Sequence, residues 1–161
     1  MAIVPKDRGI QCEIKTYGPA YADVFDRAVK AAGLSETNVI VSSFNAAALK
    51  DFKQRKPAYR TLFLTGVNGK TTPDDLIVKG RDMGVFAICP GAEQAKKQGW
   101  TVEQADKIRA AGFSFRFFGV NRAEMLKYAA TMKAEAFTCN FFEDAFTWAK
   151  AAGVALIPPA K

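Results

Sequence analysis

The sequence of 161 residues contains no histidine. Histidine is the commonest acid–base side chain near neutral pH, so its absence excludes histidine-dependent hydrolysis by this chain alone. Cysteine is scarce too: three residues without Cys-x-x-Cys spacing form neither a disulfide framework nor a zinc site. We interpret Cys12, Cys89 and Cys139 as small hydrophobic residues in strands or at their ends.

Long apolar runs are also absent. None approaches the roughly 18 residues that cross a bilayer, and the start Met-Ala-Ile-Val-Pro-Lys-Asp is not that of a signal peptide. We therefore expect no membrane span and a cytoplasmic location. The sequence shows no linker or low-complexity tract, and its apolar content of 49% is typical of a globular protein. A single domain over residues 1–161 is the expected organisation.

Acidic residues are fewer than basic ones, which gives a net charge of +7. Much of this charge lies on predicted helix surfaces, as at Lys50, Lys53 and Arg55. A solvated helix face explains such a distribution, and no basic motif interleaved with aromatic residues is present. The charge is compatible with a small anionic partner and argues against nucleic acid.

What the sequence does contain is a repeated strand–helix pattern. Six short apolar stretches start roughly 21 to 28 residues apart, about the length of one βα unit, and a helix pattern follows each. Helices between consecutive strands impose parallel pairing, so the predicted fold class is α/β with functional groups where the strands end. The predicted strands are Ile10–Ile14, Asn38–Val41, Tyr59–Leu64, Val85–Ile88, Phe113–Phe118 and Glu135–Thr138.

Capping residues delimit the predicted helices. Periodicity indicates a first helix from about Ala20 that Gly33 ends, and a last helix over roughly residues 143–152. Capping patterns indicate three more starts, and Asn45 is predicted to cap the second helix. The predicted starts are Thr72-Pro73 with Asp75, Thr101 with Gln104, and Asn121 with Glu124.

One loop carries a phosphate-binding signature. Thr65-Gly66-Val67-Asn68-Gly69-Lys70-Thr71-Thr72 lies between a predicted strand and helix and resembles the ATP loop of the Mur ligases. Gly66, Gly69, Lys70 and Thr71 are therefore candidate phosphate contacts. The loop departs from the consensus, because Leu64 stands where a glycine is expected, and a Gly/Asn turn before a capped helix is the alternative interpretation.

Four other stretches resemble one protein family. Gln11-Cys12-Glu13-Ile14-Lys15 places a carboxylate and an amine on one face of the first strand. Val39–Phe44, Phe118–Asn121 and Ala136–Asn140 follow in order. Together they resemble strands three, four, seven and eight of the glycerophosphodiester phosphodiesterases, TIM barrels that carry Glu-Ile-Lys, Val-Ser-Ser-Phe, Trp-Thr-Val-Asn and Thr-Asp there. The resemblance covers most of residues 10–153 and implies a partial or open TIM-barrel-like fold of about six βα units.

The resemblance also implies a function and site residues. Members hydrolyse glycerophosphodiesters to an alcohol and glycerol 3-phosphate with Ca²⁺ or Mg²⁺. Glu13 matches a metal-coordinating carboxylate, and Lys15 matches the catalytic lysine that faces metal and phosphate. Phe118, Asn121 and Ser43 match substrate-binding positions. The simpler interpretations are an ion pair for Glu13 and Lys15, a helix cap for Asn121 and local backbone bonding for Ser43.

The sequence also lacks several residues that the family uses for catalysis and metal binding. The strands that carry its histidines and a Glu-x-Asp metal pair have no counterpart, and Cys139 replaces the final aspartate. A single carboxylate holds a divalent cation weakly, so we expect no turnover by the isolated chain. Two missing βα units would leave open sheet edges, so the chain is expected to be an open sheet, to recruit a second copy or partner chain, or to belong to a longer product.

Three function classes follow. The first is a phosphodiesterase-like domain that is inactive alone. The second is a non-catalytic barrel remnant that binds a phosphate ligand or a protein. The third is a nucleotide-binding module built on the loop Gly66–Thr72.

Overall fold

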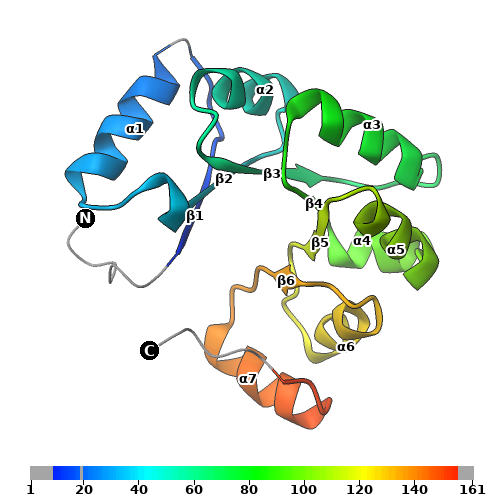
Figure 1. The fold of residues 1–161 in the computed structure, drawn as a ribbon. Coiled ribbons are helices and arrows are strands. Elements are labelled where there is room, and N and C mark those ends of the chain that lie inside the picture. Colours follow the sequence, from blue (N-terminus) through cyan, green and yellow to red (C-terminus); the bar gives the residue numbers. More distant parts are fainter. Residues whose placement is uncertain (1–8, 19, 156–161) are drawn as a thin grey trace. The chain divides into compact units, whose positions relative to one another are not determined.

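The computed structural model describes residues 9–18 and 20–155 (Figure 1). Strands and helices alternate along the chain, and the sheet has the sequential order β1-β2-β3-β4-β5-β6. The strands are β1 (Ile10–Glu13), β2 (Val39–Ser43), β3 (Arg60–Thr65), β4 (Ala87–Pro90), β5 (Ser114–Phe117) and β6 (Ala136–Phe137). The helices are α1 (Tyr21–Ala31), α2 (Ala46–Arg55), α3 (Pro73–Met83), α4 (Ala92–Lys97), α5 (Val102–Ala110), α6 (Ala123–Thr131) and α7 (Phe142–Ala151), with a short 3₁₀ turn η1 (Glu36–Asn38) before β2.

The described residues form two compact units. The first contains residues 9–63 and Lys79–Phe86, and the second contains Leu64–Val78 and residues 87–155. Parallel pairing joins β1 to β2 and β2 to β3, and likewise β4 to β5 and β5 to β6. The α/β prediction is confirmed, and each of the six predicted strands corresponds to an observed one.

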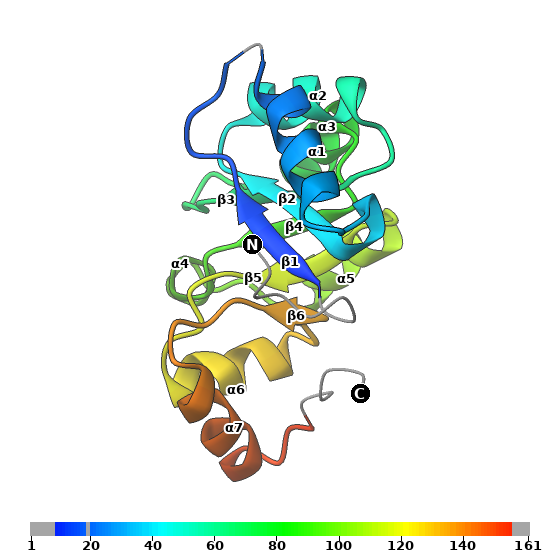
Figure 2. The ribbon, with the colours of Figure 1, turned by 90° about the vertical axis from the view of Figure 1, so that its left-hand side faces the viewer.

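The core of the first unit lies between its strands and the helices α1 and α2, which cover one face of β1 and β2 (Figure 2). Val39 and Val41 are buried there because they lie two residues apart, on the face of β2 that these helices cover. Phe25, Phe52 and Tyr59 add edge-to-face ring contacts with centroids 5.5–5.8 Å apart. This packing fixes the strand ends that carry Glu13 and Ser43.

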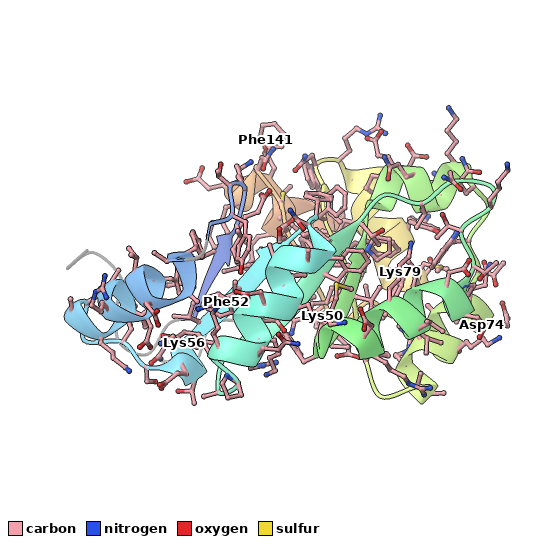
Figure 3. All side chains as sticks on the ribbon, turned by 90° about the horizontal axis from the view of Figure 1, so that it is seen from above. Lys50, Phe52, Lys56, Asp74, Lys79 and Phe141 are labelled. Atoms are coloured by element: carbon pink, nitrogen blue, oxygen red, sulfur yellow. The ribbon has the colours of Figure 1, made fainter. Side chains whose placement is uncertain are left out.

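A nearly buried carboxylate, Asp26 of α1, also belongs to this core. It accepts a hydrogen bond from the Tyr59 hydroxyl at 2.9 Å and one from the Lys30 ammonium at 2.9 Å. Lys56, labelled in Figure 3, follows the last residue of α2. Its Nζ atom lies 3.4 Å from the Asp26 carboxylate and 2.8 Å from that of Asp23. The Lys30 and Tyr59 bonds lower the pKa of Asp26, although partial burial acts in the opposite direction.

In the second unit, buried aromatic residues of β5 form the centre. Phe115 and Phe117 are fully buried with ring centroids 5.0 Å apart, and Phe117 contacts Tyr128 of α6. Their burial places both in the core of this unit.

Most predicted helix starts are confirmed by their caps. The Asn45 side chain accepts from the Ala48 amide at 3.1 Å, and Asp75 accepts from the Thr72 amide at 3.1 Å. The Thr101–Gln104 capping box is present. Two features differ from the sequence analysis: α4 was not predicted, and the cap of α6 is not the one expected.

The N-cap of α6 is Arg122, so the prediction that Asn121 caps this helix is wrong. The Asn121 side chain instead accepts a hydrogen bond from the Asn140 amide at 2.8 Å, across to the segment that follows β6. A tertiary partner has replaced the local one that the capping pattern implies.

Candidate functional site

Glu13 and Lys15 lie at the carboxyl end of β1. Their side chains form an ion pair with Nζ and Oε2 3.6 Å apart, as strand alternation predicts. The lysine side chain is 79% exposed and the glutamate 32%, so solvent screens the pair and it contributes little to stability. Both groups are therefore accessible to a ligand in solution.

Ser43 ends the neighbouring strand β2 and is completely buried. Its hydroxyl donates to the Ile14 carbonyl at 2.7 Å and accepts from the Asn45 amide at 3.0 Å. These bonds join the end of β1 to the start of α2, so the geometry gives Ser43 a local structural role. A substrate contact by this hydroxyl remains a prediction.

Ser42 and Gln11 are further neighbours of Glu13 that no sequence motif marks. Ser42 lies opposite Glu13 in the strand register, its hydroxyl donates to the Cys12 carbonyl, and it accepts from the Gln11 side chain at 3.3 Å. Alternation along β1 places Gln11 on the same face as Glu13. The face of the sheet that carries Glu13 and Lys15 therefore also carries the polar side chains of Gln11 and Ser42.

In the second unit, Phe118 and Asn121 follow β5. Phe118 is half-buried and forms a parallel bridge with Gly91, the N-cap residue of α4. Asn121 holds the Asn140 amide as described above. Phe118 thus presents part of its ring at the carboxyl end of the sheet, whereas the side-chain oxygen of Asn121 is already engaged.

The loop after β3 bonds largely to itself. The Lys70 amide donates to the Asn68 side chain at 2.9 Å, the Thr71 amide to the Asn68 carbonyl at 2.9 Å and the Thr72 amide to Asp75 at 3.1 Å. Phosphate-binding loops use such amides to hold the anion. A nucleotide contact by Gly66, Gly69, Lys70 and Thr71 remains a prediction. To bind a phosphate, the amides of Lys70, Thr71 and Thr72 would have to give up their present partners.

The fit to a divalent cation is incomplete in the part of the chain that the structure describes. No group of three or more histidine, cysteine, aspartate or glutamate residues is placed to hold a metal ion within residues 9–18 and 20–155. Glu13 supplies one carboxylate with the Lys15 ammonium beside it. One oxygen donor next to a cation is a weak site for a hard divalent ion, so we derive no chemical step through a metal.

A further residue, Gln94 of α4, emerged from the structure alone. Its Oε1 accepts a hydrogen bond from the Val67 amide at 3.2 Å, although the two residues are 27 positions apart. Val67 is buried, so its amide requires such a partner. No spacing in the sequence marks this contact.

Many solved structures are similar to this chain, and three of them illustrate the match. A glycerophosphodiester phosphodiesterase from Thermotoga maritima matches with a TM-score of 0.67 and 16% identity, over 92% of this chain and 59% of the other. A Silicibacter pomeroyi protein described as a glycerophosphoryl diester phosphodiesterase matches with a TM-score of 0.77 and 16% identity, over 92% and 52%. An Oleispira antarctica phosphodiesterase in complex with the product sn-glycerol-3-phosphate matches with a TM-score of 0.68 and 15% identity, over 89% and 56%.

The chain therefore spans about half the length of these structures. No protein-family profile and no curated protein sequence matches it. The fold and the strand ends define a partial TIM-barrel-like α/β chain. More particularly, the fold is that of the glycerophosphodiester phosphodiesterases, which confirms the resemblance at the level of structure.

No helix among the described residues is long and apolar enough to span a membrane.

Proposed function

We propose that the chain is a glycerophosphodiester phosphodiesterase-type domain that binds the phosphate of a glycerophosphodiester through Lys15. The observation that supports it is the accessible Glu13–Lys15 pair at the end of β1, in a fold shared with these enzymes. An ammonium group attracts a phosphate oxygen in a short charge-assisted contact. Glu13 lies beside it, with Oε2 3.6 Å from the Lys15 Nζ.

The chain's own residues account for binding better than for turnover. Hydrolysis of the diester requires a group that gives a proton to the leaving alcohol, and the sequence has no histidine for this step. Glu13 is proposed as one ligand of a Ca²⁺ or Mg²⁺ ion whose other ligands come from outside the described residues. In this proposal the isolated chain binds the phosphate ester and does not hydrolyse it. Phe118 and Asn121, in the second unit, are proposed substrate contacts on the resemblance alone.

Lys15→Ala tests the proposal directly. We expect the unchanged chain to bind sn-glycerol 3-phosphate and inorganic phosphate in a calorimetric titration, and Lys15→Ala to weaken both by about tenfold, because a charge-assisted bond is lost. The control is Lys50→Ala, which removes another exposed ion-paired lysine, 2.5 Å from Asp82. Equal affinities for Lys15→Ala and the unchanged chain would refute the proposal.

Turnover is tested separately with glycerophosphocholine and either metal ion. Release of glycerol 3-phosphate by the isolated chain, abolished by Glu13→Gln, would contradict the proposed lack of turnover. If a separate polypeptide carries the remaining strands, refolding it together with this chain is expected to produce activity.

ATP-dependent thermal stabilisation that Lys70→Ala abolishes would instead support the nucleotide-binding alternative.

A further inference from the structure

The helix α7 of the second unit has apolar residues on two of its sides. It packs against α6, beside which it lies in Figures 1 and 2, and buries Ala145 and Ala149. Phe142 and Phe146 lie one turn apart on another side and are 69% and 42% exposed. Their rings contact each other edge to face, with centroids 5.0 Å apart. These two phenylalanines form an exposed apolar stripe, which we call the α7 face.

Two opposite charges border the α7 face. Glu143 belongs to the first turn of α7 and Lys150 to its last turn. Phe146 follows Glu143 by three residues and precedes Lys150 by four, so the three side chains share one side of the helix. Both charged residues are exposed, and neither forms an ion pair with another of the residues that the structure describes. Each charge is therefore available to a partner molecule.

A second copy of α7 complements this face when the two helices run in opposite directions. The helix has ten residues and is therefore about 15 Å long, so the first turn of one copy lies beside the last turn of the other. Phe142 and Phe146 of the two copies then pack together. Glu143 of each copy faces Lys150 of the other, whereas parallel helices would bring like charges together.

We propose that the α7 face is the contact surface of a two-fold dimer of this chain, with the two α7 helices antiparallel. A two-fold interface needs one patch that is complementary to itself, and the charges of α7 meet this requirement. The acidic first turn, with Glu143 and Asp144, disfavours an anionic lipid surface as the alternative occupant. A patch of this size lies below the roughly 1,200 Å² typical of stable complexes, so the dimer is weak and depends on concentration.

Charge reversal in the full chain tests this pairing by sedimentation equilibrium. We expect Glu143→Lys and Lys150→Glu each to weaken the dimer about five- to thirtyfold, because each places like charges together at both ends of the interface. An equimolar mixture of the two variants is expected to form a heterodimer with about the affinity of the unchanged chain, since opposite charges meet again at both ends. A folding defect in either variant would not produce this recovery.

The apolar part of the interface is tested by Phe142→Ser. We expect this variant to weaken the dimer about tenfold, because it removes a ring from the centre of the contact in both copies. The control is Val78→Ser on α3, which removes another exposed apolar side chain of the same unit, 66% exposed, and is expected to leave the affinity unchanged. Association through β1 would be common to all these variants, so differences between them report on the α7 face.

Three results would overturn the α7 dimer. The first is equal association of the unchanged chain and the two charge-reversal variants, and the second is a mixture that associates no more tightly than its components. The third is binding of the unchanged chain to phosphatidylcholine vesicles, lost in Phe142→Ser, without any effect of this variant on self-association, which would assign the α7 face to a lipid surface. The inference uses no residue of the proposed phosphate site, so phosphate binding tests the proposed function alone.

Discussion

At the scale of single residues, Gly91 shows how little space is left for a Cβ atom beside Phe118. Its backbone torsion angles, φ −70° and ψ 127°, are open to any L-residue. The restriction comes from space, because the Phe118 ring lies 3.0 Å from where a Cβ atom would be placed. Position 91 therefore favours glycine for packing, because the Phe118 ring would have to move by a few tenths of an ångström to admit a Cβ atom, and not for backbone conformation.

We predict that Gly91→Ala lowers the free energy of unfolding by about 1–3 kcal/mol, the usual cost of overpacking. The control is Gly18→Ala, where no atom lies within 4 Å of the new Cβ. There the smaller entropy of the unfolded chain is expected to stabilise the protein by about 0.4–1 kcal/mol. Urea denaturation of both variants checks the opposite signs, and a shared sign would contradict the packing argument.

Asp26 connects pH to the stability of the first unit. Because its pKa in the folded chain lies below its ordinary value of 3.8, folding favours the ionised form. The contribution of the Asp26 carboxylate to the free energy of unfolding is complete above its pKa in the unfolded chain. This contribution is lost as the pH falls through its lower pKa in the folded chain. Protonation of Asp26 in the folded chain weakens its bonds to Lys30 and Tyr59.

We expect Asp26→Asn to lower the melting temperature at pH 7. Below about pH 4, the melting temperature of this variant is expected to change less with pH than that of the unchanged chain. The difference between the two melting curves should therefore shrink as the pH falls. Asp82→Asn, which removes the exposed partner of Lys50, is the control and should change the melting temperature little. A difference for Asp26→Asn that stays constant down to pH 2 would contradict this mechanism.

At the scale of elements, α2 depends on its cap. Asn45 accepts from the Ala48 amide, and the Asn45 amide itself bonds to the buried Ser43 hydroxyl. We predict that Asn45→Ala costs about 1 kcal/mol of stability and that Asn45→Asp, which can cap equally well, costs little. Thermal or urea unfolding of the pair checks this, and equal losses would exclude the side-chain cap as the cause.

Local patterns explain why most elements were predictable. Strand alternation and apolar runs identified all six strands. Gly33, with φ +70°, follows the C-cap residue of α1, as expected for a glycine that ends a helix. The helix α4 escaped prediction because six residues are too few to show a helical period, and its N-cap Gly91 offers no side chain as a signal.

The candidate site was predictable only where its geometry is local. Glu13 and Lys15 lie two residues apart on one strand, so alternation alone brings them together. Gln94 and Val67, by contrast, meet only because β3 and β4 end beside one another. Asn121 illustrates the same limit, since its partner Asn140 belongs to the segment after the next strand.

At the scale of the whole molecule, β1 and β6 are the two end strands of the sheet order. The Ile14 amide bonds to the Ser42 carbonyl on the β2 side, so alternation turns the Gln11 and Glu13 amides toward the opposite side of β1. An edge of this kind can pair with another strand. A second copy or a partner chain remains our proposal for such pairing.

We predict concentration-dependent association of the chain in sedimentation velocity experiments. Gln11→Pro, which removes one outward amide and keeps the bonds to β2, should reduce it, whereas Gln11→Ala retains the amide and should not. A monomer at every concentration, or equal effects of the two variants, would contradict pairing through β1.

The packing of Gly91 against Phe118 and the bond of Gln94 to Val67 have an evolutionary consequence. A change at one position of either pair alters the space or the bonding available to the other, so the two members are expected to vary together among relatives. Alanine at position 91 should accompany a smaller residue than phenylalanine at 118. Loss of the glutamine at 94 should accompany proline at 67, which has no amide hydrogen and needs no acceptor.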